Sequence, residues 1–236
     1  MELRGSATAA PAAVLSEGVI EALGRRIIEG ALRPGDRLTL ESLQEEYLVS
    51  RTVVRESIRT LETLNLVYSK RRVGVVVQPA QRWNVLDARI MRWRLAGQGR
   101  ASQFRSLTEL RSAVEPVAAA CAARSAGLEE RALLVELAER MRRTGPAGHG
   151  EDFLAADIAF HTLLLRSSGN ELFASLDYVV REVLEGRTRL GLMPAAPAQA
   201  VHRHELIARA VSEGRPAEAQ DHTARLLDEV RSAIGD

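Results

Sequence analysis

Apolar residues recur at helical spacing in three short segments near the start of the chain, with turn-forming residues between them. The pattern predicts helices over residues 17–30, 41–47 and 50–64. Pro34 and Gly35 force a turn after the first helix, and residues 48–50 turn the chain before the third. Two helices joined by a tight turn, as in the second and third segments, indicate a helix-turn-helix.

The helix predicted over residues 50–64 has one polar, mostly basic face and one apolar face. The polar face carries Arg51, Thr52, Arg55, Arg59 and Glu62. Ser50 is a good N-cap, because its hydroxyl can accept a hydrogen bond from a free amide of the first turn. Arginine can bridge guanine O6 and N7 or bind a phosphate, and threonine can contact a base edge, so this face suits the major groove of DNA. The alternative is the solvated face of an ordinary amphipathic helix, and the flanking segments decide between the two.

After residue 64 the period changes to that of strands, through LVYS, KRRVG and VVVQ. Gly74 gives the backbone freedom that a hairpin needs, and the turn carries Lys70, Arg71 and Arg72. Residues 51–72 hold six basic and two acidic side chains, a local net charge of +4. A basic hairpin directly after a helix-turn-helix favours a winged helix-turn-helix that binds double-stranded DNA, over residues 14–78.

Residues 79–103 hold both tryptophans and predict a linker with one short amphipathic helix that would dock two domains. Its buried side is expected to hold Trp83, Leu86, Ile90 and Trp93. Every later segment has helical period, with helices expected over residues 106–125, 128–143, 151–167, 170–187, 198–213 and 216–234. Pro116 is expected to bend the first of these. The chain is therefore predicted to be mainly α, with an antiparallel all-α bundle over residues 104–236 after the winged helix.

Composition places the chain among globular proteins of the cytoplasm. It has 236 residues, 46% of them hydrophobic and 27% charged. No run approaches the roughly 20 apolar residues of a membrane span, and residues 1–13 lack the apolar core of a signal peptide and are expected to be a disordered tail. The single cysteine, Cys121, cannot form an intrachain disulfide, which suits a reducing compartment.

Four side chains in the predicted bundle have the chemistry of metal ligands. Asp157 and His161 are four residues apart and project from the same side of one helix, and His204 and His222 each lie on an apolar stripe of another. A carboxylate with imidazoles can hold a divalent ion such as Zn²⁺, Ni²⁺ or Mn²⁺. The alternative for each histidine is a core or surface residue with ordinary hydrogen bonds.

The sequence of residues 19–78 resembles the winged-helix domain of the GntR family of bacterial regulators. The family pattern V-S-R-T-x-V-R-E-A-L-R-x-L corresponds here to VSRTVVRESIRTL. The resemblance implies that Ser50, Arg51, Thr52 and Arg55 contact bases or phosphates, and that the wing contacts DNA near Arg72 and Gly74. One departure is Glu41, where many members of the family carry an arginine that contacts a phosphate.

The rest of the chain resembles the FCD ligand-sensing domain of the FadR subgroup of that family. The resemblance lies in the E-L-R-x-x-x-E-P run of residues 109–116 and the D-x-x-F-H…S-G-N run of residues 157–170, and WNVLDARIMRW resembles the linker of the galactonate and gluconate type of sugar-acid regulator. It implies a homodimer, a metal site at Asp157, His161 and His204, and an effector site that includes Arg111. The family's last histidine aligns with Leu226, so His222 substitutes for it, or the site has three ligands or is empty.

Three further observations concern the effector. Arg111 can clamp a carboxylate through two hydrogen bonds, or it is an exposed arginine paired with Glu115. Asn170 is a second effector-binding candidate, although capping a helix suits it better. The alternatives for Arg181, Arg187 and Arg189 are that they face a cavity or are solvated, and we favour the solvated interpretation.

The function predicted from these features is that of a repressor released from its operator by a small carboxylate such as a sugar acid. The alternative is a metal-dependent hydrolase that uses Asp157, His161 and His204. The chain carries no G-x-S-x-G, H-E-x-x-H or phosphate-loop motif, which favours a protein that is not an enzyme.

Overall fold

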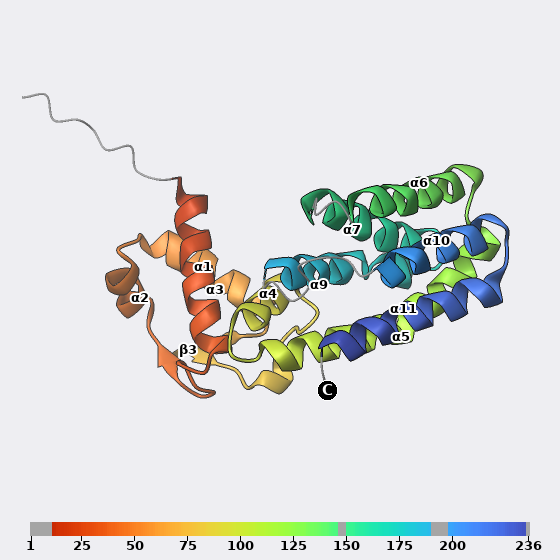
Figure 1. The fold of residues 1–236 in the computed structure, drawn as a ribbon. Helices are drawn as coiled ribbons and strands as arrows, with labels where there is room; N and C mark the ends of the chain where they lie inside the picture. Colours follow the sequence, from red (N-terminus) through yellow and green to blue (C-terminus); the bar gives the residue numbers. More distant parts are fainter. Residues whose placement is uncertain (1–10, 146–149, 190–197, 235–236) are drawn as a thin grey trace, which may run out of the picture. The chain divides into compact units, whose positions relative to one another are not determined.

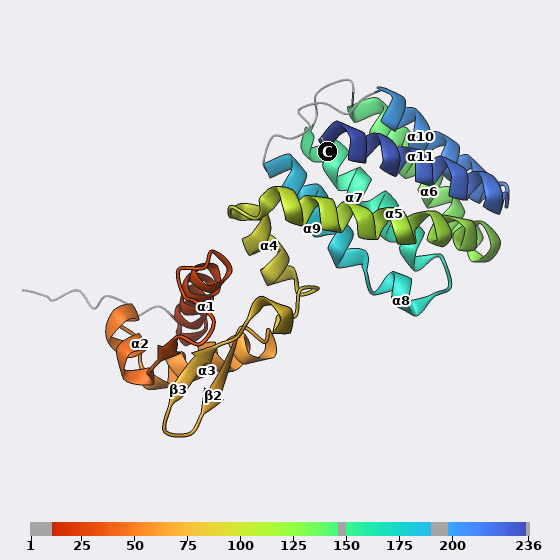
Figure 2. The ribbon, with the colours of Figure 1, turned by 90° about the horizontal axis from the view of Figure 1, so that it is seen from below.

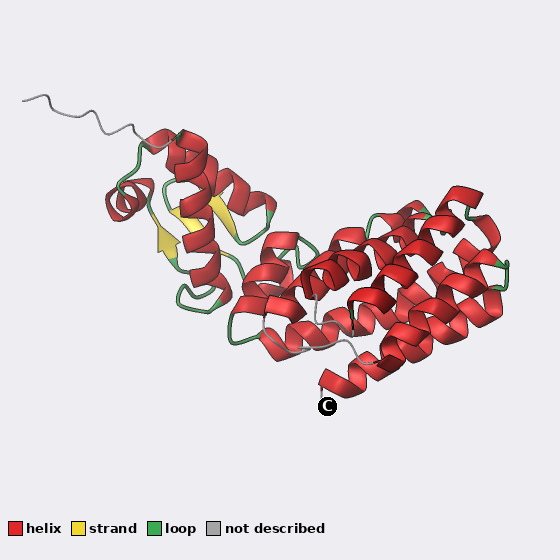
Figure 3. Ribbon diagram, turned by 45° about the horizontal axis from the view of Figure 1, so that its top comes forward, coloured by secondary structure: helices red, strands yellow, loops and turns green. Residues whose placement is uncertain are grey.

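The computed structural model describes residues 11–145, 150–189 and 198–234, and the chain divides into two compact units between Gly99 and Arg100 (Figure 1). The predicted fold class is confirmed: the first unit combines helices with a small sheet, and the second is a helical bundle. In the described parts of the chain the strands all belong to the first unit (Figure 3).

The described part of the first unit begins with three helices and three short strands. These are α1 (Ala12–Ile28), β1 (Arg37–Leu38), α2 (Leu40–Tyr47), α3 (Arg51–Thr63), β2 (Val67–Lys70) and β3 (Gly74–Val77). The strands are antiparallel in the order β1-β3-β2, and Figure 2 shows the hairpin of β2 and β3. Both Arg37 and Tyr68 are in register with Val76. The hairpin was predicted, whereas β1 was read as part of a turn because two residues show no alternation.

The helix-turn-helix is fixed by side-chain caps. Before α2, the Thr39 hydroxyl accepts a hydrogen bond from the Ser42 amide, and the Ser42 hydroxyl accepts one from the Thr39 amide. Before α3, the Ser50 hydroxyl accepts from the Val53 amide at 3.4 Å, as predicted. These caps set the residues at which the two helices begin.

The apolar face of α3 lies in the core of the first unit. Leu23, Leu43, Val54, Leu61 and Leu66 have no exposed surface there. A buried hydrogen bond of 3.1 Å between the hydroxyls of Ser16 and Ser57 also joins α1 to α3. Because one face of α3 is held in this core, its polar face is turned to solvent.

The tryptophan-rich segment belongs to the first unit. It forms a 3-10 turn, η1 (Ala80–Arg82), and α4 (Ala88–Ala96), which lies against α1. Ile90 and Trp93 are buried in the core of the first unit, and the Trp93 indole donates to Glu21 at 2.7 Å. Leu86, expected on the buried side, is exposed because α4 begins two residues after it.

Because α4 packs closely on α1, adding one methyl group at Gly24 is expected to destabilise the first unit strongly. A Cβ at Gly24 would lie 2.3–2.7 Å from ring atoms of Trp93. Gly24→Ala is expected to lower the unfolding free energy of this unit by about 1–3 kcal/mol through overpacking. Gly18→Ala is the matched control on the same helix, because a Cβ there meets nothing within 4 Å. Urea unfolding followed by tryptophan fluorescence measures the stability of both variants. Equal stability of the two would contradict the close contact between Gly24 and Trp93.

The second unit is a bundle of helices. Its members are α5 (Arg100–Ser125), α6 (Leu128–Thr144), α7 (Gly150–Arg166), α8 (Glu171–Ala174), α9 (Asp177–Arg189), α10 (Ala198–Ser212) and α11 (Pro216–Ile234). The helix α5 lies along α11 and begins six residues earlier than predicted (Figures 1 and 2). The helix predicted over residues 170–187 is two helices, because the Leu176 amide donates to the Phe173 carbonyl, three residues back instead of four.

Facing sides of α5, α6, α7, α10 and α11 form the main core of the bundle, with Phe160, Met141 and Leu164 fully buried. A smaller cluster lies between α5, α7 and α9, around Ile158 and Leu184. Among the described residues, no helix is long and apolar enough to cross a membrane.

Candidate functional site

The polar face of α3 and the tip of the hairpin present most of the predicted DNA-binding residues to solvent. Arg51, Thr52, Arg55 and Arg59 are exposed along α3, and Arg72 is exposed in the turn of the hairpin with φ of 64°. Arginine and threonine side chains of this kind can contact phosphates and base edges in the major groove.

Two predicted DNA-binding residues have structural roles. The exposed Ser50 hydroxyl is engaged in capping α3. Gly74 has φ of +101°, and a Cβ there would lie 2.6 Å from the backbone oxygen of Leu38 on β1. Glycine is therefore required at this position for the sheet to close, whatever the wing contacts.

Glu41 reduces the positive charge at the start of α3. Its carboxylate lies 3.7 Å from the guanidinium of Arg51, and both side chains are exposed. A carboxylate at this position would repel a DNA phosphate and compete with it for Arg51.

Glu41→Gln is therefore expected to tighten DNA binding several-fold at low salt, with a smaller gain at high salt because exposed charges are screened. Fluorescence anisotropy with duplex DNA across a salt series measures the change. Glu45→Gln, on the same helix, is the control. An unchanged or weaker DNA affinity of Glu41→Gln would contradict the inference that the Glu41 carboxylate opposes DNA binding.

The second unit brings three of the four predicted metal ligands together. Asp157 and His161 project from α7 and His204 from α10, and all three are buried. The two Nε2 atoms are 3.2 Å apart, and Asp157 Oδ1 lies 3.3 Å from each of them. His222 lies outside this group, and Leu226 is part of the apolar core. The expected fourth ligand is therefore not assembled.

The surroundings of both histidines favour metal binding. His161 Nδ1 lies 2.7 Å from Glu115 Oε2, and His204 Nδ1 donates to the Ala200 carbonyl at 2.7 Å. A bound ion would leave the proton on Nδ1 of both rings and take up the Nε2 lone pairs, which lie beside Asp157 Oδ1. Neighbouring ligands of a tetrahedral ion with bonds of roughly 2.0 Å are about 3.3 Å apart, so the three atoms fit a divalent ion.

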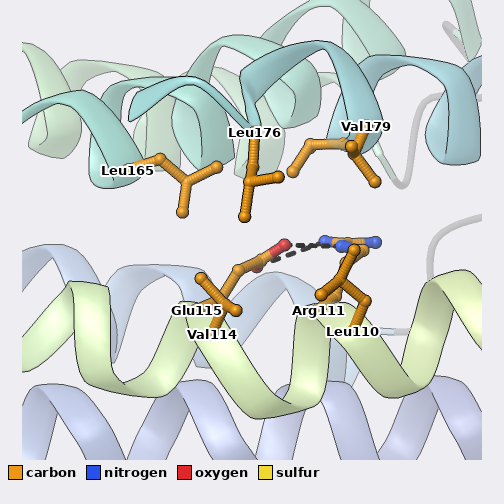
Figure 4. A pocket seen from close by; sticks show the side chains of 8 residues that line it. Leu110, Arg111, Val114, Glu115, Leu165, Leu176 and Val179 are labelled. Atoms are coloured by element: carbon orange, nitrogen blue, oxygen red, sulfur yellow. Dashed lines mark hydrogen bonds and ion pairs between the residues drawn. The ribbon is translucent and has the colours of Figure 1, made fainter. Parts of the chain in front are cut away.

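Two buried arginines pair with carboxylates at the candidate metal site, one with Asp157 and one with Glu115, the neighbour of His161. Arg187 on α9 donates through Nη2 to Asp157 Oδ2 at 2.9 Å, and Arg111 on α5 donates through Nε to Glu115 Oε1 at 2.6 Å. Arg111, predicted as a carboxylate clamp or an exposed partner of Glu115, is a buried partner of Glu115 (Figure 4). The interpretation of Arg187 as solvated was wrong, whereas Arg181 and Arg189 are exposed.

These contacts set the ionisation of the carboxyl groups. Burial raises the pKa of Glu115, but Arg111 and His161 outweigh it, so that the pKa falls to about 2. Burial likewise raises the pKa of Asp157, yet hydrogen bonds from the two histidines and the charge of Arg187 hold it well below its usual range. Both carboxylates are therefore ionised, the form that a metal ligand or its partner requires.

The predicted effector residues are not gathered in one cavity. Asn170 caps α8 by accepting from the Leu172 amide at 2.9 Å. The cavity beside Arg111 has a volume of about 10 Å³ and is otherwise lined mostly by apolar side chains, including Leu165, Leu176 and Val179 (Figure 4). It is large enough for one water molecule, so a larger effector requires movement of its lining.

An exposed basic helix in one unit and a buried set of candidate metal-ligand and arginine side chains in the other are the arrangement expected of a two-domain DNA-binding regulator. The family model "Bacterial regulatory proteins, gntR family" matches residues 15–77, and the FCD domain model matches residues 106–229. The chain belongs to the GntR family, in the FadR subgroup that carries an FCD domain. It is a DNA-binding transcriptional regulator, and the family is one of regulators rather than of hydrolases.

Relatives along most of the chain agree with this assignment. The galactonate operon transcriptional repressor of Escherichia coli K12 is 30% identical over 201 residues, which cover 83% of this chain and 86% of the repressor. The solved structure of Lar, which controls the expression of the Listeria monocytogenes agr system, is 20% identical with a TM-score of 0.57, over 93% and 96% of the chains. The GntR structure from Streptococcus agalactiae is 23% identical with a TM-score of 0.50, over 92% and 99%. These structures share the fold.

Proposed function

We propose that the protein is a repressor that leaves its operator when a small carboxylate binds in the helical unit together with a divalent ion. The observation that carries the proposal is the buried group of Asp157, His161 and His204 with arginines on both sides. A separate unit with an exposed basic helix supplies the output. The galactonate repressor is similar over most of both chains, which supports a sugar acid as the effector.

The three ligands would hold Zn²⁺, Ni²⁺ or Mn²⁺, and the ion would supply a positive charge that binds a carboxylate oxygen. Glu115 and the Ala200 carbonyl orient the histidines, and Arg187 orients Asp157. The effector can change DNA affinity only to the extent that it prefers one arrangement of the protein over another.

A homodimer belongs to this proposal. Winged helices that read palindromic operators do so in pairs, one for each half-site. A dimer would place two copies of the α3 face on successive turns of the DNA, and its symmetry would be that of the operator.

A mobility-shift titration on the DNA upstream of the protein's own gene tests the proposal. With Zn²⁺ present, D-galactonate or another aldonic, uronic or dicarboxylic acid is expected to release the DNA. The same acid should raise the melting temperature, because it binds the folded state alone. Failure of every acid in the panel to change either DNA binding or melting would contradict the proposed sensor.

A further inference from the structure

Glu62, in the last turn of α3, reaches from that helix to the outer strand of the hairpin. Its carboxylate oxygen Oε1 accepts a hydrogen bond from the backbone amide of Ser69 on β2, at 2.7 Å. The strand β2 is an edge strand, because the order in the sheet is β1-β3-β2. Amides on the open side of an edge strand have no partner within the sheet. The Glu62 side chain supplies such a partner and thereby ties α3 to the hairpin.

The hydrogen bond to Ser69 lies close to the basic tip of the hairpin. The base of the hairpin is fixed separately, because the side-chain amide of Gln78 donates to the carbonyls of Asn65 and Val67, at 3.1 and 3.3 Å. Ser69 is further along β2, and the basic residues 70–72 follow it directly in the chain. The contact with α3 therefore fixes the part of β2 that carries these basic side chains.

The charge of Glu62 and its hydrogen bond have opposite effects on DNA affinity. Glu62 is the acidic member of the polar face of α3, which otherwise carries Arg51, Arg55 and Arg59. A negative charge on this face would repel DNA phosphates. A hydrogen bond from a backbone amide to an ionised carboxylate is, however, about twice as strong as one between neutral groups, so the same carboxylate holds the hairpin firmly.

We propose that Glu62 is a positioning residue for the wing, and that it holds the basic tip of the hairpin where the tip contacts DNA beside α3. The side chain acts on the DNA through Lys70, Arg71 and Arg72 rather than by touching it. Without the hydrogen bond the tip is free to move relative to α3, and ordering it again on the DNA costs conformational entropy.

Fluorescence anisotropy with the full chain and duplex DNA from upstream of its own gene measures the effect. Glu62→Ala is expected to weaken DNA binding by roughly tenfold, the size of one lost contact, although it removes a negative charge from a basic face. Glu62→Gln should bind at least as tightly as the wild type, because the glutamine oxygen can accept the same hydrogen bond without the charge. Glu56→Ala removes an exposed carboxylate from the same helix and is the matched control, with affinity expected to be unchanged or slightly higher.

The loss in Glu62→Ala should depend on the basic residues of the tip. In the wild type, Arg72→Ala is expected to weaken binding and to lower its salt dependence, because a cationic contact is lost. In a Glu62→Ala background the same change should have much less effect, because the tip is no longer held. Residues that act independently give additive changes in binding free energy, so this double-mutant cycle separates positioning of the wing from a general loss of stability.

Glu62→Asp keeps the test decisive even if Glu62→Ala fails to fold. Aspartate keeps the negative charge but is one methylene shorter, so it should bind DNA more weakly than the wild type. Two results would overturn the inference. They are binding at least as tight as wild type by the folded Glu62→Ala or Glu62→Asp variant, and additive effects of the Glu62 and Arg72 changes. The experiment contains no metal ion and no acid, so its failure is distinguishable from a failure of the proposed effector response.

Discussion

Arg55→Ala and Arg51→Ala are each expected to weaken operator binding by about 1–3 kcal/mol if the arginine reads a base. Both side chains are exposed on α3, whose opposite face is held in the core. Removing a base contact lowers the preference for the operator over unrelated DNA, whereas removing a phosphate contact weakens binding to both and lowers the salt dependence. Anisotropy titrations with the two kinds of DNA, across salt concentrations, separate these cases.

The control for this prediction is Arg33→Ala. Arg33 is an exposed arginine of the same unit, in the turn before β1 and off α3 and the hairpin. It should change binding little. Unchanged affinity of both α3 variants at every salt concentration would exclude α3 as the recognition helix.

Glu115→Gln is expected to lower the unfolding free energy of the helical unit by roughly 3–5 kcal/mol. The substitution keeps the size of the side chain but leaves the guanidinium of Arg111 buried without a counter-charge, and both side chains are almost fully buried. It also removes the carboxylate that lies 2.7 Å from His161 Nδ1. Chemical unfolding followed by circular dichroism measures the loss.

Glu213→Gln is the matched control, because Glu213 also pairs with an arginine four residues away, Arg209, but on the surface. It should leave the unfolding midpoint essentially unchanged, since exposed pairs contribute little. If the two substitutions shifted the midpoint equally, the buried network would not stabilise the bundle.

Local patterns were sufficient for much of the DNA-binding unit. The two-faced pattern of α3 and the cap at Ser50 depend on residues within one or two helical turns, so the sequence shows them directly. The strand β1 escaped prediction because its two residues are defined by pairing with β3, nearly forty positions later. The packing of Trp93 on Gly24 likewise depends on contact between distant segments.

In the candidate metal site, too, local spacing predicts some contacts, whereas others depend on how distant helices pack. Asp157 and His161 share a helix face, so their closeness was predictable from spacing. The contact of Arg187 with Asp157 joins residues 30 positions apart on two helices, and nothing in the sequence near Arg187 distinguishes it from the exposed Arg181 and Arg189. The distance of His222 from the other ligands also follows from how the helices pack, and periodicity alone does not determine that packing.

The most direct experiment asks whether the buried candidate metal ligands control DNA binding. Operator affinity is measured by anisotropy, with Zn²⁺ and increasing D-galactonate or the acid that raises the melting temperature most. The comparison is between the wild type and a His161→Ala/His204→Ala variant. We expect the acid to weaken wild-type operator binding at least about tenfold, whereas the variant binds the operator with unchanged affinity and is not released. Equal release of both proteins would contradict it.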